Sequence, residues 1–249
     1  MAAMIALTAV PTLSYAQGNA LSFNAALSSD YRYRGISQTR LKPAVSAGVD
    51  YALSNGFYVG AWGSTIKWIK DANGDANLEL DLYGGYKGEL SKGVGFDVGL
   101  LQYIYPSAKT AGWDADYKDP NTTEIYGALT TGPFTGKLSY ALTNLFGNYD
   151  FDNSRSSKGS FYFDLSAGFD VGSGVTLTPH LGYQKVKNIT DASYTDYSLT
   201  ASKDFSGFLV SAGVVGTDAD KAFYVPGSAA NSTKFLGKTA VVLSVKYSF

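Results

Sequence analysis

Residues 159–171, GSFYFDLSAGFDV, alternate between apolar and polar side chains along the whole stretch. Phe161, Phe163 and Leu165 have one parity, and Tyr162 and Asp164 have the other. Successive side chains of a β-strand point to opposite faces. A strand of a membrane barrel presents one face to lipid and the other to the lumen over about ten residues. The stretch therefore predicts a strand of a transmembrane β-barrel.

The same alternation recurs in residues 20–34, 77–88 and 238–249, where the charged side chains again have a single parity. Together, these alternating runs predict an all-β protein, a transmembrane antiparallel up-and-down barrel of about twelve strands. The expected strands cover residues 20–34, 43–53, 57–67, 77–88, 95–105, 122–131, 134–144, 159–171, 175–186, 193–203, 207–217 and 238–249.

The predicted connections differ in length on the two sides of the barrel. Short, turn-rich links at 54–56, 89–94, 132–133, 172–174 and 204–207 alternate with mostly longer ones at 35–42, 68–76, 106–121, 145–158, 187–192 and 218–237. Outer-membrane barrels have this asymmetry. Aromatic residues near strand ends are expected to form the interfacial girdles, namely Tyr31, Tyr33, Tyr51, Tyr86 and Tyr247.

The composition agrees with this class and excludes others. The chain has 249 residues, of which 45% are hydrophobic, with 28 Gly, 19 Tyr and 14 Phe. A net charge of −1 makes nucleic acid a poor partner. There is no cysteine, so neither disulfides nor thiolate metal sites are expected, and we expect no cofactor. A soluble β-sandwich or lipocalin-like barrel is the alternative, but its apolar face would point inward, and twelve strands would then need a large packed core.

The two ends of the sequence suggest export. Residues 1–16 resemble a signal peptide, with an apolar stretch followed by small Ser14 and Ala16 before a cleavage point. The basic n-region is missing, so the start is truncated or the first Met is internal. Residues 17–249 then form a single barrel. The terminal Phe249 resembles the signal read by the barrel-assembly machinery, which predicts outer-membrane lipid as surroundings and a Gram-negative outer membrane as location.

Several segments also resemble the TorF-type porin family of Gram-negative bacteria. They are NAALSSDYRYRGISQ (24–38), PAVSAGVDY (43–51), GFYVGAW (56–62), NLELDLYGGYKGE (77–89) and FDVGLLQYIYP (96–106). The resemblance is strongest over residues 20–140 and implies a small outer-membrane porin. It assigns no activity to particular residues.

The polar parity is expected to line a lumen. An eight-stranded barrel is filled by side chains and one of 16–18 strands leaves a wide channel, so about twelve strands predict a narrow aqueous pore. The alternative is a lumen plugged by the loops 106–121 and 218–237. The expected pore-lining residues are Asp30, Arg32, Arg34, Asp50, Glu79, Asp81, Lys87, Glu124, Lys137, Asp164, His180, Asp196 and Lys246.

These features predict a passive diffusion channel for small hydrophilic solutes or ions, with oligomeric state left open. The alternative is a non-conducting barrel whose extracellular loops bind a partner. An enzyme is not expected, because the only histidine, His180, has no G-x-S-x-G elbow to work with. A weak calcium candidate places side-chain oxygens at Asp71, Asn73, Asp75 and Asn77. An Asx-rich turn without metal is the better interpretation.

Overall fold

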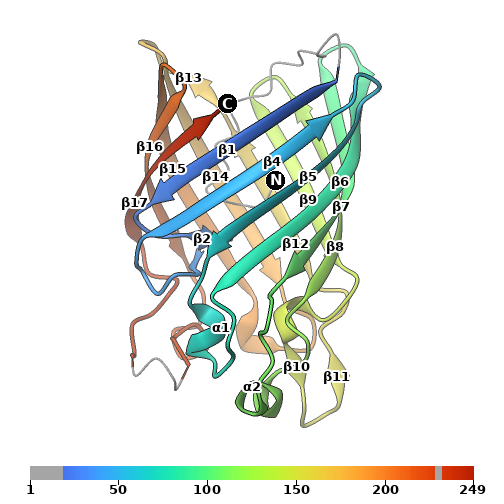
Figure 1. Cartoon of the computed structure of the whole chain (residues 1–249), viewed down its shortest axis with the longest axis vertical. Helices are drawn as coiled ribbons and strands as arrows, with labels where there is room; N and C mark the ends of the chain where they lie inside the picture. Colours follow the sequence, from blue (N-terminus) through green and yellow to red (C-terminus); the bar gives the residue numbers. More distant parts are fainter. Residues whose placement is uncertain (1–18, 228–231) are drawn as a thin grey trace.

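A computed structural model describes residues 19–227 and 232–249. In this part of the chain, twelve antiparallel strands, tilted relative to the barrel axis, form a closed barrel (Figure 1). We call these twelve barrel strands the staves, to distinguish them from the short strands of the loops. The fold class predicted from the alternation is confirmed. The predicted signal peptide, residues 1–16, lies outside the described residues.

The staves follow one another in chain order. They are β1 (Ala20–Ser28), β4 (Ala44–Ala52), β5 (Phe57–Thr65), β6 (Leu78–Ser91), β7 (Val94–Ile104), β8 (Thr122–Thr131), β9 (Phe134–Ala141), β12 (Phe161–Ala167) continued by β13 (Phe169–Asp170), β14 (Val175–Lys185), β15 (Tyr194–Phe205), β16 (Phe208–Thr217) and β17 (Ala240–Ser248). The barrel closes where β1 pairs with β17, with Ala26 opposite Lys246. Closure leaves no free sheet edge, as a membrane-spanning sheet requires.

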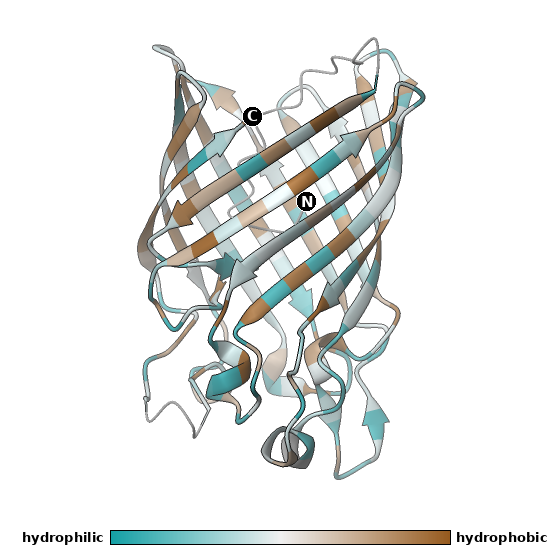
Figure 2. Ribbon diagram, viewed as in Figure 1, coloured by the Kyte–Doolittle hydropathy of each residue, from teal (hydrophilic) through white to brown (hydrophobic). Residues whose placement is uncertain are grey.

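The outside of the barrel is apolar. Leu27, Leu82, Leu165 and Val241 are between 43% and 64% exposed, and they all have the apolar parity of their strands. Figure 2 shows hydrophobic and hydrophilic residues alternating along the staves. A closed barrel with such an exterior buries its apolar face only in lipid.

The short and the long connections lie at opposite ends of the barrel, as predicted. Short turns join the strands at one end, and the longer loops gather at the other, which we call the loop end (Figure 1). The loops carry α1 (Trp68–Asp71), α2 (Ala111–Asp116), η1 (Leu145–Gly147), the hairpin of β10 (Tyr149–Asp150) and β11 (Arg155–Ser156), and η2 (Thr190–Ala192). None of the described helices is long and apolar enough to cross a membrane.

The predicted C-terminal end of the first strand, residue 34, is wrong. The first stave ends at Ser28 rather than at residue 34. The chain then turns inward and forms a small hairpin of β2 (Arg32–Tyr33) and β3 (Ile36–Ser37) before β4 begins. The other staves differ from the prediction by a few residues at their ends.

The inward turn also corrects the predicted aromatic girdle. Tyr51, Tyr86 and Tyr247 are 38–40% exposed on the barrel exterior, near the end with the short turns. Tyr31 and Tyr33 are only 1% and 7% exposed, because they follow the chain into the lumen. They are therefore not interfacial residues.

Candidate functional site in the barrel lumen

Residues 29–43, the inserted segment, fold into the lumen between β1 and β4. Asp30 fixes the segment internally, since its carboxylate accepts hydrogen bonds from Arg32 Nε at 2.6 Å, Ser37 Oγ at 2.5 Å and Thr39 Oγ1 at 3.0 Å. The Arg32 guanidinium also donates to the carbonyls of Leu236 and Lys238, both at 3.1 Å. Asp30 and Arg32 therefore shape the segment rather than line an open strand.

Arg34 connects the inserted segment to the barrel wall. Its Nη2 donates to both carboxylate oxygens of Glu124 on β8, at 3.0 and 2.8 Å, and its Nη1 donates to Gln184 on β14 at 2.6 Å. The guanidinium also lies between the rings of Tyr33 and Tyr162, 4.7 and 4.3 Å from their centroids. Charge-assisted bonds of this kind are stronger than neutral ones, so Arg34 is the principal anchor of the segment.

Two tyrosines of the segment bond to residues of β6 and β7. The Tyr31 hydroxyl donates to Glu79 on β6 at 2.6 Å, and the Tyr105 hydroxyl donates to the other Glu79 oxygen at 2.8 Å. The hydroxyls of Tyr33 and Tyr103 lie 2.8 Å apart. The predicted lining residue Glu79 is thus present in the lumen but engaged with phenol hydroxyls.

Aromatic rings fill the space around this polar core at the loop end. Phe146 of η1 packs against Tyr33, Tyr103, Tyr105 and Trp68, with ring centroids 5.2–6.4 Å apart. Its backbone is left-handed, with φ 50° and ψ 39°, a conformation that non-glycine residues adopt at an energetic cost. Many aromatic contacts hold Phe146 in that conformation.

The loops 106–121 and 218–237 are the alternative plug of the lumen that the sequence predicts. Trp113 from the first loop and Leu236 from the second are indeed buried, at 0% and 6% exposed. Residues 228–231 of the second loop lie outside the described residues. The segment that reaches β6, β8 and β14, however, is 29–43, which was predicted to be strand and surface loop.

Farther along the lumen, His180 on β14 lies between two carboxylates. Its Nδ1 is 3.3 Å from Asp164 Oδ2 on β12, and its Nε2 is 2.9 Å from Asp196 Oδ1 on β15. The Tyr162 hydroxyl donates to Asp196 Oδ2 at 3.0 Å. The structure therefore brings together three predicted lining residues from adjacent staves.

Toward the short-turn end, charged side chains and tyrosines alternate around the wall. Tyr83 donates to Asp50 at 2.6 Å, and Tyr58 donates to Asp97 at 2.5 Å. The ammonium groups of Lys87 and Lys137 lie over tyrosine rings, 5.6 Å from the centroid of Tyr58 and 4.1 Å from that of Tyr126. Lys246 shares the inward parity of Val242, which is 1% exposed.

Asp81 is the exception among the lining carboxylates. It is 0% exposed on β6, and within the described residues neither of its side-chain oxygens has a hydrogen-bond partner. An unpaired buried charge is costly. We therefore expect the barrel to tolerate removal of the Asp81 carboxylate.

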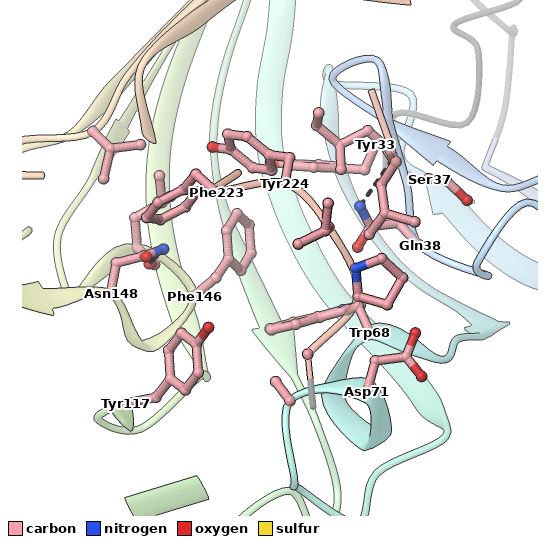
Figure 3. A pocket seen from close by; sticks show the side chains of 18 of the residues that line it. Tyr33, Ser37, Gln38, Trp68, Asp71, Tyr117, Phe146, Asn148, Phe223 and Tyr224 are labelled. Carbon is pink, nitrogen blue, oxygen red and sulfur yellow. Dashed lines mark hydrogen bonds between the residues drawn. The ribbon is translucent and has the colours of Figure 1, made fainter. Parts of the chain in front are cut away.

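A cavity of about 330 Å³ opens among the loops above the inserted segment. Its walls include Tyr33, Trp68, Tyr117, Phe146, Phe223 and Tyr224, with Gln38 and Asn148 among them. In Figure 3 the side chains of Phe223 and Tyr117 face those of Trp68 and Gln38 across this space. We call it the vestibule. Of these cavity-lining residues, the sequence singled out only Tyr33, and as an interfacial aromatic, because the side chains meet only after the loops fold together.

The loop segment 222–227 closes one side of the vestibule. Tyr224 donates from its hydroxyl to the carbonyl of Ala192 at 2.6 Å, and burial raises the pKa of this hydroxyl, so it stays protonated. Gly227 lies against α1, where an added Cβ would come within 2.1 Å of the Asp71 carbonyl oxygen. The segment is therefore tied to both η2 and α1.

The weak calcium candidate falls in the α1 loop beside the vestibule. Asp71 forms an ion pair with Arg40, and the Asp75 carboxylate lies 3.4 Å from Lys70 Nζ. Among residues 19–227 and 232–249, no group of three or more carboxylate or histidine side chains is placed to hold a metal ion. The acidic side chains of this loop have basic neighbours in place of a metal.

A closed barrel with an apolar exterior and a polar, partly filled lumen defines the porin-like class of outer-membrane barrels. The chain belongs to a family described as bacterial protein of unknown function (Gcw_chp), which matches residues 14–249. The TorF-type assignment within that class stays a prediction. Among curated protein sequences, none matches the chain.

Solved porins share the fold at very low sequence identity. The KdgM porin is 10% identical with a TM-score of 0.53, over 92% of this chain and 98% of that one. A second structure, of KdgM in complex with disordered oligogalacturonate, has a TM-score of 0.54, with the same identity and coverage. The NanC porin is 9% identical with a TM-score of 0.52, over 92% and 99% of the two chains. These likenesses establish a common barrel architecture.

Proposed function

We propose that the protein is an outer-membrane channel that lets small polar solutes and ions diffuse through a narrow lumen. The observation that carries the proposal is the arrangement of the wall, apolar outside and polar inside around a closed ring of twelve staves. A barrel of this size is wide enough to leave space beyond its side chains. The porin folds of KdgM and NanC support the same function.

The inserted segment makes the channel narrow. Arg34 reaches β8 and β14, and Tyr31 reaches β6, so the segment crosses much of the lumen near the loop end. Longer loops of outer-membrane barrels face the cell exterior. A solute would enter through the vestibule, pass the inserted segment, and leave past the wall around Asp50 and Lys87.

The charges that line the lumen favour cations. Asp30 is paired with Arg32, and Glu124 is paired with Arg34, so these four side chains add no net charge to the lumen. Of the other predicted lining residues, the acidic ones outnumber the basic ones, and His180 lies between two carboxylates. They are Asp50, Glu79, Asp81, Asp164 and Asp196 against Lys87, Lys137 and Lys246. A ring of acidic side chains selects cations.

Single-channel recording tests this function. The refolded protein is inserted into a planar bilayer, and the reversal potential is measured in a salt gradient. We expect discrete conductance steps with a modest preference for cations. An electrically silent bilayer that contains folded, heat-modifiable barrel would contradict the channel.

A second candidate is a closed barrel whose loops bind a partner. It is favoured by the aromatic cluster of Tyr33, Tyr103, Tyr105, Trp113 and Phe146, which fills much of the loop end. A silent bilayer would support this candidate.

Catalysis is not part of the proposal. Both ring nitrogens of His180 face carboxylates, at 3.3 and 2.9 Å. A histidine that activates a serine needs one nitrogen free to take the hydroxyl proton. Ser166 and Ser198 lie opposite His180 on the neighbouring staves. Neither serine finds a free ring nitrogen, because Asp164 and Asp196 already face both nitrogens of His180.

A further inference from the structure

We propose that the vestibule binds a neutral saccharide of one or two rings. This inference rests on the proposed channel function and names the solute class that the channel would select. Three properties of the cavity support it, namely its walls, its hydrogen-bonding groups and its charge.

The walls of the vestibule are aromatic on opposite sides. Trp68 lines one side, and Tyr117 and Phe223 line the other (Figure 3). Aromatic side chains offer large rigid apolar faces. A pyranose ring has apolar C–H faces of similar size, which can stack on such side chains.

The hydrogen-bonding groups around these walls suit hydroxyls. The amide nitrogens of Gln38 and Asn148 donate to the carbonyls of Ile36 and Leu145, at 3.0 and 2.8 Å. Among the described residues, no donor bonds to the side-chain carbonyl oxygen of either amide, so both can accept hydrogen bonds from solute hydroxyls. A hydrocarbon or plain aromatic solute would leave these groups unsatisfied.

The charge of the cavity argues for a neutral solute. Among the described lining residues the only charged side chain is Asp71, and it is paired with Arg40. An acidic sugar would need an unpaired cation at this place, and none lines the cavity. A volume of about 330 Å³ lies near the lower end of the range for small-molecule sites, which is about 300–1,000 Å³. One or two rings fit that space better than a long chain does.

The test is a binding titration of the purified full barrel in detergent, followed by isothermal calorimetry and tryptophan fluorescence. Maltose is the neutral probe, digalacturonate the acidic probe and phenol the aromatic probe. We expect maltose to bind and to change the fluorescence, with digalacturonate and phenol binding more weakly. No binding of maltose, or tighter binding of either other probe, would overturn the proposal.

A matched pair of variants locates the binding. Phe223 lines the vestibule and is 38% exposed, whereas Phe151 is a loop aromatic of 41% exposure that does not line it. Phe223→Ala should weaken maltose binding roughly two- to tenfold, which corresponds to the loss of one aromatic contact, and Phe151→Ala should leave it unchanged. Equal effects of the two variants would place the sugar elsewhere and refute the assignment.

Binding and conduction are measured separately, so the two proposals can fail independently. Maltose binding in a barrel that never conducts would remove the channel and keep the saccharide site. Conductance steps in a barrel that binds no maltose would keep the channel and remove the site.

Discussion

The guanidinium of Arg34 forms a two-pronged hydrogen bond with the Glu124 carboxylate, with distances of 3.0 and 2.8 Å from the same nitrogen. Both side chains are almost fully buried, at 3% and 2% exposed. Because the two residues lie 90 positions apart in the chain, the pair fixes the inserted segment against a distant stave. Its removal should therefore change both stability and conductance.

The first prediction concerns this anchor. Arg34→Ala leaves Glu124 buried without its partner, which costs on the order of 3–5 kcal/mol of unfolding free energy. It should also raise the single-channel conductance, because the inserted segment loses its bonds to β8 and β14. Arg155→Ala is the control, since Arg155 forms an exposed ion pair with Asp150 in the β10–β11 hairpin. An unchanged conductance for Arg34→Ala would show that the anchored segment does not limit the flow of ions.

A second prediction uses two glycines with the same φ angle. Gly35 and Gly93 both have φ +79°, but a Cβ at Gly35 would lie 2.5 Å from Thr217 Cγ2, whereas a Cβ at Gly93 meets nothing within 4 Å. Gly93→Ala should cost only the left-handed backbone term, about 1–2 kcal/mol. Gly35→Ala should cost more and should displace the inserted segment. Urea unfolding in lipid vesicles measures the difference, and equal losses would argue against tight packing at Gly35.

The third prediction compares two acids on the same face of β6. Glu79→Gln removes a charged acceptor from two tyrosine hydroxyls, and bonds to charged groups contribute about 1.5–3 kcal/mol each. Asp81→Asn removes a buried carboxylate that has no hydrogen-bond partner among the described residues. We expect Glu79→Gln to destabilise the barrel and Asp81→Asn to be neutral or stabilising. Destabilisation by Asp81→Asn would reveal a partner, such as an ordered ion.

A fourth prediction tests the lipid-facing surface. Leu82 and Leu90 both point outward from β6, with 51% and 63% exposure. Leu82 lies in the middle part of the stave and Leu90 near its end at the short turn. Leu82→Lys should destabilise the folded barrel by about 2–4 kcal/mol and Leu90→Lys by about 0–1 kcal/mol, because the cost of a charge depends on its depth in the bilayer. Equal costs would mean that the two positions lie at similar depths.

The staves were predictable from sequence because the alternation of residues is itself the physical requirement of a membrane strand. The inserted segment was not. Asp30, Arg32 and Arg34 continue one parity and Tyr31 and Tyr33 the other, so the local pattern is the same for a longer strand and for a hairpin in the lumen. The difference lies in contacts with residues far along the chain, such as Arg32 with the Leu236 carbonyl, 204 positions away.

The residues that line the lumen were likewise predictable only in part. Periodicity predicted that Asp164, His180 and Asp196 share a face, and the register of the staves brings them within hydrogen-bonding distance. The vestibule could not be predicted, because Trp68, Phe146 and Phe223 come from three different loops without regular spacing. Only the folded arrangement of those loops creates the cavity.

The position of the inserted segment in the chain constrains the order of assembly. The segment directly follows β1, the stave that closes the seam with β17, and Arg32 holds the backbone just before β17 through the carbonyls of Leu236 and Lys238. These bonds join residues from the two ends of the barrel sequence, so they form only once the first and last strands have come together. Closure of the barrel and fixing of the constriction are therefore coupled.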